Sequence, residues 1–550
     1  MALLMLHGWK ARIHHLTRKK TFLMRTSLII LVAGLAMGCV IQGVRTAAGP
    51  ASTRAVSLSP LVQRFGDAWR KLETSSDPAP RDLLKWLRHF FAQREDLAGE
   101  LDANPPELDA YLKDGRLLGF DVRAMIEKHA QAGTERQLFS DFILAGLAGD
   151  DDKGKAAFER IKQVAEQSPA VPLANEMLAH LWLDRKRETG ALAAFIREGA
   201  FEDAEAARES ALRLAIEQKD ADLLRDLMQQ PRWKTAATSW MRSRIGAITG
   251  DVWMQWKGII GHQIETTRWG ILALTLFSTG LWYIIFTQHS AKEPWRWARP
   301  ALPVIAGVCS IWPTLIILTY QEFQLGMTGD APFPHDLWYY LAGVGLREEL
   351  SKMALFAVFM PYLLWRRSAG IALLTGAFVG LGFALEENIQ YFGEGGGIAW
   401  ARFLTANFMH ASMTGIIGHA LYEMLRARFG HAEKFVATFL AVVAAHGFYD
   451  YVSVSDHAIS QLMGISIFSI IILAFLARHF FDLLATTTLV STGVVSSASV
   501  FLIGSALLIA TLFIVAGITT DDISGIAAVG SECVSVAPIA FIFWKKFEVQ

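Results

Sequence analysis

The chain of 550 residues has little cysteine and no excess of charge of either sign. Its three cysteines stand alone in apolar segments and form no CxxC pair, so the sequence gives no sign of a disulfide framework. Lys and Arg total 52, and Asp and Glu also total 52. Because there is no net positive charge, we expect no nucleic acid partner.

Three signatures of membrane-embedded hydrolases are also missing. The sequence has no HExxH motif, no GxGD motif and no GxSG-type serine with a partner histidine in an apolar segment. These absences argue against the corresponding protease classes without excluding hydrolysis.

Long apolar runs dominate what is present. Hydrophobic residues make up 52% of the chain and the mean hydropathy is +0.30, too apolar for an ordinary soluble enzyme of this length. We predict an all-α fold, a polytopic transmembrane helix bundle with an exported, solenoid-like helical domain. At about 20 apolar residues per span, about ten spans are expected, at residues 27–44, 269–287, 300–320, 337–364, 370–392, 398–420, 434–452, 459–477, 498–518 and 523–544.

The N-terminal 44 residues resemble a signal anchor. A basic stretch, "WKARIHHLTRKKTFLMR", precedes an apolar run without charge. The run contains "LAMGC", which ends at Cys39 and loosely resembles a lipoprotein cleavage box. The alternatives are a lipidated Cys39 and an uncleaved anchor. In either case the basic flank stays in the cytoplasm and the following residues are exported.

Residues 45–265 differ in composition from the rest. Apolar residues recur at three- and four-residue spacing in segments such as "RDLLKWLRHFFAQREDL", with charges between them. Breaks such as "SSDPAP" and "ANPPE" separate the helices. Helical hairpins in series suggest a small extracytoplasmic solenoid that binds a peptide or protein ligand. A helical domain that only packs on the membrane part explains the pattern equally well.

The charges of the loops predict the orientation. Basic loops such as "KEPWRWARP" and "WRRS" alternate with loops that lack Lys and Arg, such as "GEGGG" and "TTDD". The positive-inside rule then gives a multi-pass protein with both termini inside and residues 45–265 outside. We expect four parts: the anchor (1–44), the helical domain (45–265), a membrane core (266–478) and C-terminal membrane helices (479–550).

Ionisable residues concentrate in four consecutive expected spans, although each charge at bilayer depth costs about 2.5–3.5 kcal/mol. Such residues normally face the interior of the bundle and mark function. They are Glu348, Glu349 and Lys352 in the first span, Glu386, Glu387 and Tyr391 in the second, His410 in the third, and His446 and Asp450 in the fourth.

Spacing indicates how these groups cooperate. Residues four apart share a helix face, so Glu348 can pair with Lys352, and His446 with Asp450. A carboxylate that orients an imidazole is the usual support of a metal-bound histidine. His410, His446 and one carboxylate would supply three ligands to Zn²⁺, and a remaining glutamate would act as general base.

Two other interpretations stay open. In an ion-coupled transporter or sensor, the same acids and histidines would relay protons. In a non-catalytic receptor, the helical domain would bind a partner and the polar cluster would be structural. Glycines in "GAFVGLGF" (Gly376, Gly380, Gly382) are expected to let helices approach closely around the cluster.

Together the four motifs resemble the PrsW family of membrane proteases. "EELSK" matches EExxK, "ENIQY" matches the ExxxY of FExxxY, and "HGFYD" matches HxxxD, with a lone histidine between them. The resemblance covers about residues 300–455. The family is related to the CAAX prenyl protease and to bacteriocin-processing enzymes, which carry a similar double-glutamate motif.

The resemblance implies a metal- or glutamate-dependent endopeptidase of a bacterial inner membrane. Its substrates would be membrane-anchored proteins, including anti-sigma factors, cleaved near the extracytoplasmic side. By position, the active site would consist of Glu348, Glu349, Glu387, His410, His446 and Asp450. We expect Glu349, or else its neighbour Glu348, to be the general base. We expect Glu387, His410 and His446 to be zinc ligands, with oxyanion support as the alternative role of the histidines, and Asp450 to orient His446. Lys352 and Tyr391 would position the carboxylates or stabilise the oxyanion. The Phe of FExxxY is replaced by Glu386, which leaves the register between Glu386 and Glu387 open.

Overall fold

The computed structural model describes residues 12–48, 60–75, 80–100, 108–149, 151–289, 298–394, 399–454, 465–487, 495–520 and 523–548. The chain divides into two compact units, one of residues 50–254 and one of residues 1–49 with 255–550. The expected C-terminal part, 479–550, does not form a unit of its own. Its expected start lies inside the helix α28, Ile465–Thr487.

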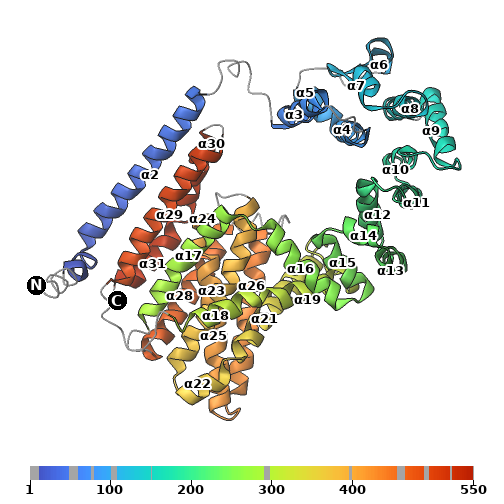
Figure 1. The fold of residues 1–550 in the computed structure, drawn as a ribbon. Helices are drawn as coiled ribbons and strands as arrows, with labels where there is room; N and C mark the ends of the chain where they lie inside the picture. Colours follow the sequence, from blue (N-terminus) through green and yellow to red (C-terminus); the bar gives the residue numbers. More distant parts are fainter. Residues whose placement is uncertain are drawn as a thin grey trace, which may run out of the picture. The chain divides into compact units, whose positions relative to one another are not determined.

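The helical unit, residues 50–254, consists of short amphipathic helices and one two-stranded hairpin (Figure 1). The hairpin pairs β1 (Arg116–Leu117) with β2 (Phe120–Asp121) in antiparallel register. The helices are α3 (Pro60–Thr74), α4 (Pro80–Ala92), α5 (Arg94–Glu100), α6 (Leu108–Asp114), α7 (Val122–His129), α8 (Thr134–Ala148), α9 (Asp152–Ala165), α10 (Ala174–Asp184), α11 (Glu188–Glu198), α12 (Glu205–Glu217), α13 (Ala221–Gln229), α14 (Pro231–Ala236) and α15 (Ser239–Thr249).

Local sequence explains where several of these helices begin. The side chain of Asp220 accepts a hydrogen bond from the amide of Leu223 at the start of α13, and Thr238 does the same for α15. Each helix from α8 to α13 packs against the next one in the chain. The location of this unit outside the membrane stays a prediction.

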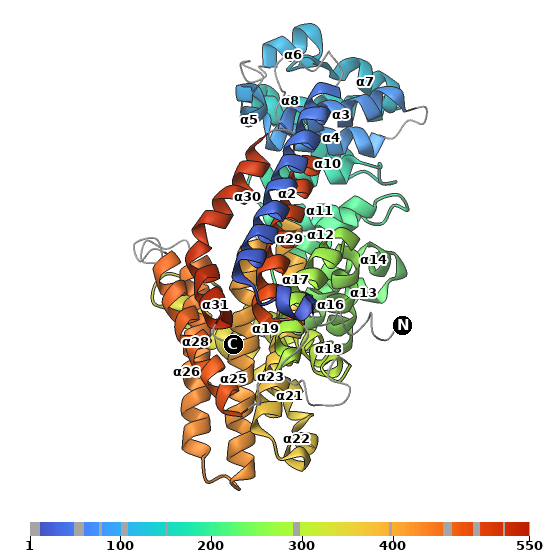
Figure 2. The ribbon, with the colours of Figure 1, turned by 90° about the vertical axis from the view of Figure 1, so that its left-hand side faces the viewer.

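The membrane unit begins and ends with helices that pack together although they are far apart in sequence. Its first helix, α2 (Lys20–Ala48), lies along α29 (Ser497–Thr519) (Figure 2). A Cβ at Gly38 of α2 would overlap the backbone of Phe513, so only glycine permits this approach. Arg45 at the end of α2 donates a hydrogen bond of 2.9 Å to the carbonyl of Thr520. These contacts tie α2 to the C-terminal helices of the membrane unit.

The membrane unit contains the following helices: α2 (Lys20–Ala48), α17 (Trp269–Gln288), α18 (Ala301–Cys309), α19 (Ile311–Gln324), α20 (His335–Trp338), the π-helix η2 (Tyr339–Gly345), α21 (Leu346–Ala357), α22 (Met360–Arg366), α23 (Ala369–Glu394), α24 (Ala399–Leu404), α25 (Ala406–Arg426), α26 (Ala432–Val454), α28 (Ile465–Thr487), α29 (Ser497–Thr519), α30 (Ser524–Ser535) and α31 (Ala537–Glu548). A further helix, α16 (Val252–Thr266), crosses the boundary between the two units.

Among the described residues, seven helical segments are long and apolar enough to span a membrane, or eight if the bent pair α30–α31 counts as one span. The predicted count of ten is therefore not confirmed. The two expected spans that fall short are 337–364 and 398–420. The first is divided among α20, η2, α21 and α22, and the second between α24 and α25. Both carry the polar residues of the expected site, which lower their hydropathy.

Glycines bring the site-bearing helices α23 and α25 together, as the sequence predicted. A Cβ at Gly380 of α23 would overlap the backbone carbonyl of His410 on α25, and one at Gly376 would meet that of Thr414. Gly382 faces α18 instead, against Val304. The close approach places the side chains of α23 and α25 within reach of each other.

Candidate active site

Helix α21 has four buried charged side chains, and three of them, Glu348, Glu349 and Lys352, belong to the site. Glu349 and Lys352 are completely buried, and Glu348 is 8% exposed. The π-helix η2 leads directly into α21, and a Cβ at Gly345, between the two, would overlap the backbone of α26 at Val443. Because π-helical turns shift the register of the residues that follow, this junction aims the glutamates of α21 toward α26.

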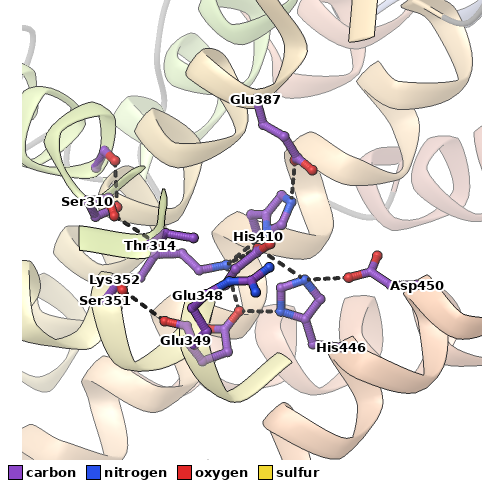
Figure 3. A network of polar contacts seen from close by, with 12 residues as sticks. Ser310, Thr314, Glu348, Glu349, Ser351, Lys352, Glu387, His410, His446 and Asp450 are labelled. Atoms are coloured by element: carbon purple, nitrogen blue, oxygen red, sulfur yellow. Dashed lines mark hydrogen bonds and ion pairs between the residues drawn. The ribbon is translucent and has the colours of Figure 1, made fainter. Parts of the chain in front are cut away.

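Lys352 lies at the centre of the cluster (Figure 3). Its Nζ is 2.7 Å from Oε1 of Glu349, 3.6 Å from Oε2 of Glu348 and 3.0 Å from Nδ1 of His410. It also lies 4.2 Å from the ring centre of Phe383. The expected pairing of Lys352 with Glu348 is therefore present, but the pairing with Glu349 is closer.

His446 of α26 is held between three carboxylates. Its Nδ1 lies 2.7 Å from Oε1 of Glu349, while its Nε2 lies 3.4 Å from Oε2 of Glu348 and 3.3 Å from Oδ2 of Asp450. The spacing of four residues predicted Asp450 as the partner that orients His446. Asp450 does contact the ring, but the shortest contact comes from Glu349 on another helix (Figure 3).

His410 of α25 is held by Glu387 of α23, at 2.8 Å from its Nε2. The same carboxylate oxygen of Glu387 lies 2.8 Å from Nη2 of Arg402 on α24. Arg402 in turn stacks on the ring of Tyr391, at 3.8 Å from its centre. Tyr391 therefore joins the site through Arg402.

The register between Glu386 and Glu387 follows from their different partners. Glu387 contacts His410, whereas Glu386 accepts a hydrogen bond from the side chain of Gln263 on α16. The same Gln263 accepts a hydrogen bond of 2.9 Å from the indole of Trp312. Among these two adjacent carboxylates, only Glu387 contacts the histidines of the cluster in the part of the chain that the structure describes.

The structure brings seven of the eight expected site residues into one network, and Tyr391 attaches to its edge. We call the seven the membrane cluster: Glu348, Glu349, Lys352, Glu387, His410, His446 and Asp450. They come from α21, α23, α25 and α26, which pack against one another. The two imidazole rings lie 5.1 Å apart between centres.

The donor set in the membrane cluster fits a divalent metal. One ligand atom each from Glu348, His410 and His446 lies within 4.8 Å of the other two, and all three residues are buried. Oε2 of Glu348 has no hydrogen-bond partner. Two imidazoles and one carboxylate suit zinc. The predicted carboxylate ligand was Glu387, which contacts Arg402, whereas the group of three ligand atoms contains Glu348.

Arg402 and two asparagines belong to the site although the sequence argument did not select them. Asn388 donates to Asn407 at 2.6 Å and accepts from Nε of Arg402 at 2.5 Å, which ties α23, α24 and α25 together. An arginine in the apolar segment "AWARFLTANF" is the signal that pointed to it, because an isolated charge in a span normally has a buried partner.

Comparison with known proteins identifies the same region. Residues 293–477 match the model of a family described as "PrsW family intramembrane metalloprotease". The match contains all seven residues of the membrane cluster, and with the apolar helices it identifies a multi-pass membrane protein. No curated protein and no solved structure matches the chain.

Proposed function

We propose, from this family match and the buried cluster, that the chain is a membrane-embedded endopeptidase that cleaves membrane-anchored proteins near the extracytoplasmic side. One observation carries the proposal: Glu348, His410 and His446, from three different helices, offer ligand atoms within 4.8 Å of one another. Burying such groups in a bundle is costly unless the site uses them. We further propose that cleavage is regulatory, as for anti-sigma factors.

Glu348, His410 and His446 would hold the metal, with zinc as the best fit to the donors. When bound, zinc supplies a Lewis acid that lowers the pKa of its water to about 7. Lys352 now contacts two of these three residues, so its ammonium and the metal would compete for the same space.

The other carboxylates divide into positioning residues and a proton acceptor. Glu349 was the expected general base, but its Oε1 is shared by Lys352 and His446 and its side chain is completely enclosed. These contacts favour a role in orienting His446. Asp450 is the most exposed carboxylate of the cluster, at 21% of its side chain, and lies 3.3 Å from Nε2 of His446. We assign to it the proton taken from the attacking water.

Two cationic side chains would complete the mechanism. Lys352, with three N–H donors in a dry site, is placed to stabilise the oxyanion that forms on the scissile carbonyl. Arg402 holds Glu387, and Glu387 holds His410, so the imidazole keeps one orientation. Tyr391 supports Arg402 by stacking.

Adjacent residues offer a matched test. Glu387→Gln should lower the cleavage of a co-expressed single-span substrate about 10- to 100-fold, the usual effect of losing a residue that orients a ligand. Glu386→Gln makes the same change one residue away and should leave cleavage within about twofold of wild type. His446→Ala should abolish cleavage while the protein remains folded and in the membrane.

Full cleavage by His446→Ala, or equal losses in Glu386→Gln and Glu387→Gln, would overturn the assignment. Proton- or ion-dependent uptake into vesicles, without new peptide ends, would instead favour the transporter.

A further inference from the structure

A cavity of about 270 Å³ lies where the ends of four helices of the membrane unit meet. It is lined from the turn before α2, the start of α2, the end of α17, the start of α29 and the end of α31. We call it the N-terminal pocket and define it by Arg18, Lys20, His289, Ser496 and Trp544. All five residues lie outside the 293–477 match, so the family does not account for them.

The charge of the N-terminal pocket has one sign. Arg18 and Lys20 are cationic, and no acidic side chain is among the described residues that line it. The lining also includes the first turn of α29, a helix of 23 residues whose N-terminus carries partial positive charge. The side chain of Ser496 caps this helix by accepting from the amide of Ser499 at 3.1 Å.

A buried histidine gives independent evidence for a missing ligand. His289 lines the pocket, is only 8% exposed, and its Nε2 has no hydrogen-bond partner. Leaving a buried polar atom without a partner is unfavourable, so such atoms usually mark a ligand or water. Nothing in the proposed proteolysis uses His289, which lies after α17 and not in the membrane cluster.

The remaining lining is apolar and aromatic. Leu23, Leu502 and Phe547 line the cavity, and Lys20 lies over the ring of Trp544 at 4.8 Å from its centre. Tryptophan beside basic residues at the ends of spanning helices is typical of the membrane–water interface. Figure 1 shows the start of α2 and the end of α31 at the same end of the membrane unit. An anionic group attached to hydrocarbon fits this mixture of surfaces.

We propose that the N-terminal pocket binds a phosphate group, either of an anionic phospholipid headgroup or of free phosphate. Arg18, Lys20 and the amides at the start of α29 would neutralise the anion, and His289 would donate or accept through Nε2. The apolar wall would contact the first carbons of an acyl chain. Such a lipid would fasten α2 to the C-terminal helices from one leaflet.

Full-length protein in neutral detergent, mixed with phosphatidylcholine vesicles with or without phosphatidylglycerol, tests the proposal. We expect wild type to retain phosphatidylglycerol after purification, and the double change Arg18→Gln with Lys20→Gln to retain at least tenfold less, since each cation near a membrane surface contributes about fivefold. Lys546→Gln is the matched control. It removes one charge from α31, outside the pocket lining, where Lys546 pairs with Asp482 at 3.3 Å.

A second variant and a second probe separate the sources of phosphate. His289→Phe keeps the ring and should also lower retention, without changing surface charge. If inorganic phosphate alone raises the thermal midpoint of wild type but not of the double variant, the ligand is free phosphate.

Equal lipid retention and equal response to phosphate in wild type, the double variant and His289→Phe would overturn the site. If Lys546→Gln lost as much lipid retention as the double variant, the binding would be a general attraction of phosphate to positive charge and not a property of the N-terminal pocket. Cleavage should persist in these variants, so failure here and failure of the proteolytic assignment are distinguishable.

Discussion

Each unit of the molecule contains a buried cluster of charges, and the two clusters are built differently. In the helical unit, Arg81 donates to three carboxylates: Glu176 at 2.5 Å, Glu198 at 2.8 Å and Asp203 at 2.9 Å. Burial opposes the charge of Arg81, but hydrogen bonds from its guanidinium to Asp203 and Glu198 outweigh it and raise the pKa of Arg81. We call these four residues the Arg81 cluster.

Charge is balanced around the Arg81 cluster once two nearby arginines are counted, and it is unbalanced in the membrane cluster. Burial raises the pKa of Glu176, although the charges of Arg81 and nearby Arg88 oppose the rise. The hydrogen bond from Arg81, with a smaller contribution from nearby Arg208, lowers the pKa of Asp203. With Arg88 and Arg208 included, three arginines face the three acids. The membrane cluster has four carboxylates, but among the described residues only Lys352 and Arg402 are cations in contact with them.

The difference teaches how to separate a structural cluster from a reactive one. In the Arg81 cluster one guanidinium contacts all three carboxylates, and its partner Asp203 is open to water at 72% of its side chain, although Oε2 of Glu198 is buried without a hydrogen-bond partner. In the membrane cluster, Oε2 atoms of Glu348 and Glu349 are buried without hydrogen-bond partners, and two imidazoles lie among them. An excess of buried acid beside imidazoles is what a divalent cation would complete.

Removal of metal should produce the largest contrast between the clusters. We expect purified wild type to contain about one equivalent of zinc, and a chelator to lower substrate cleavage at least about 10³-fold, with recovery on adding zinc. Hydrogen exchange in the helical unit should not change, because nothing in the Arg81 cluster calls for a metal.

Two glutamate variants sharpen the same prediction. Glu348→Gln should lose the zinc even at high zinc concentration, whereas Glu387→Gln should bind it about 10- to 100-fold more weakly and refill. Metal analysis by mass spectrometry with cleavage assays measures both. Full cleavage by metal-free wild type would show that Lys352 alone supplies the cation and that the site is glutamate-dependent.

Breaking the Arg81 cluster should affect stability rather than chemistry. Arg81→Met leaves Glu176 and Glu198, which are 4% and 0% exposed in their side chains, without the guanidinium. Losing one partner of a buried ion pair costs about 3–5 kcal/mol, and we expect the lower end because Asp203 is hydrated. Hydrogen exchange in α4, α10 and α11 should accelerate about 100-fold, with no change in α21, α23 and α25.

Arg70→Met is the control for the loss of an arginine. Its partner Asp67 lies at 2.5 Å, but the two side chains are 72% and 63% exposed. An exposed pair contributes about 0–1 kcal/mol, so exchange should hardly change. Similar effects in Arg70→Met and Arg81→Met would remove the distinction between the buried and the exposed pair.

The membrane cluster could be predicted from the sequence because its ionisable residues recur at a spacing of four within single helices. Pairs four residues apart, such as His446 and Asp450, lie on one helix face whatever the tertiary fold is. The contacts that decide the roles are tertiary. The partner at the shortest distance from His446 is Glu349, which is 97 residues away in the sequence, and no periodicity reveals that pairing.

The predicted number of spans was not confirmed, and the cause is the same set of polar residues that revealed the site. The expected spans 337–364 and 398–420 carry glutamates, lysine and histidine, and these residues make them less apolar than an ordinary span. The arrangement of α30 and α31 was also missed, because a bend of 53° within one apolar run leaves no strong break in the sequence.

A smaller difference between the units concerns pH. The helical unit also buries a histidine, His180, that is not part of the Arg81 cluster. Burial, with a further contribution from nearby Arg88, holds the pKa of His180 well below its ordinary value of about 6.5. His180 packs edge-on against Phe195, and its Nε2 has no hydrogen-bond partner. In the folded unit it stays neutral.

The sign of the pH dependence follows from which state binds the proton. Below about pH 6.5 the unfolded chain protonates His180 and the folded chain does not, so acid favours unfolding by up to about 1.4 kcal/mol per pH unit. His180→Phe keeps the ring contact with Phe195 and removes this proton uptake. Exchange in α10, corrected for intrinsic rates, should therefore accelerate between pH 7.5 and 5.5 in wild type by up to about tenfold more than in His180→Phe. An equal acceleration in both proteins would assign the acid sensitivity to other groups, because the carboxylates around Arg81 are unchanged by this substitution.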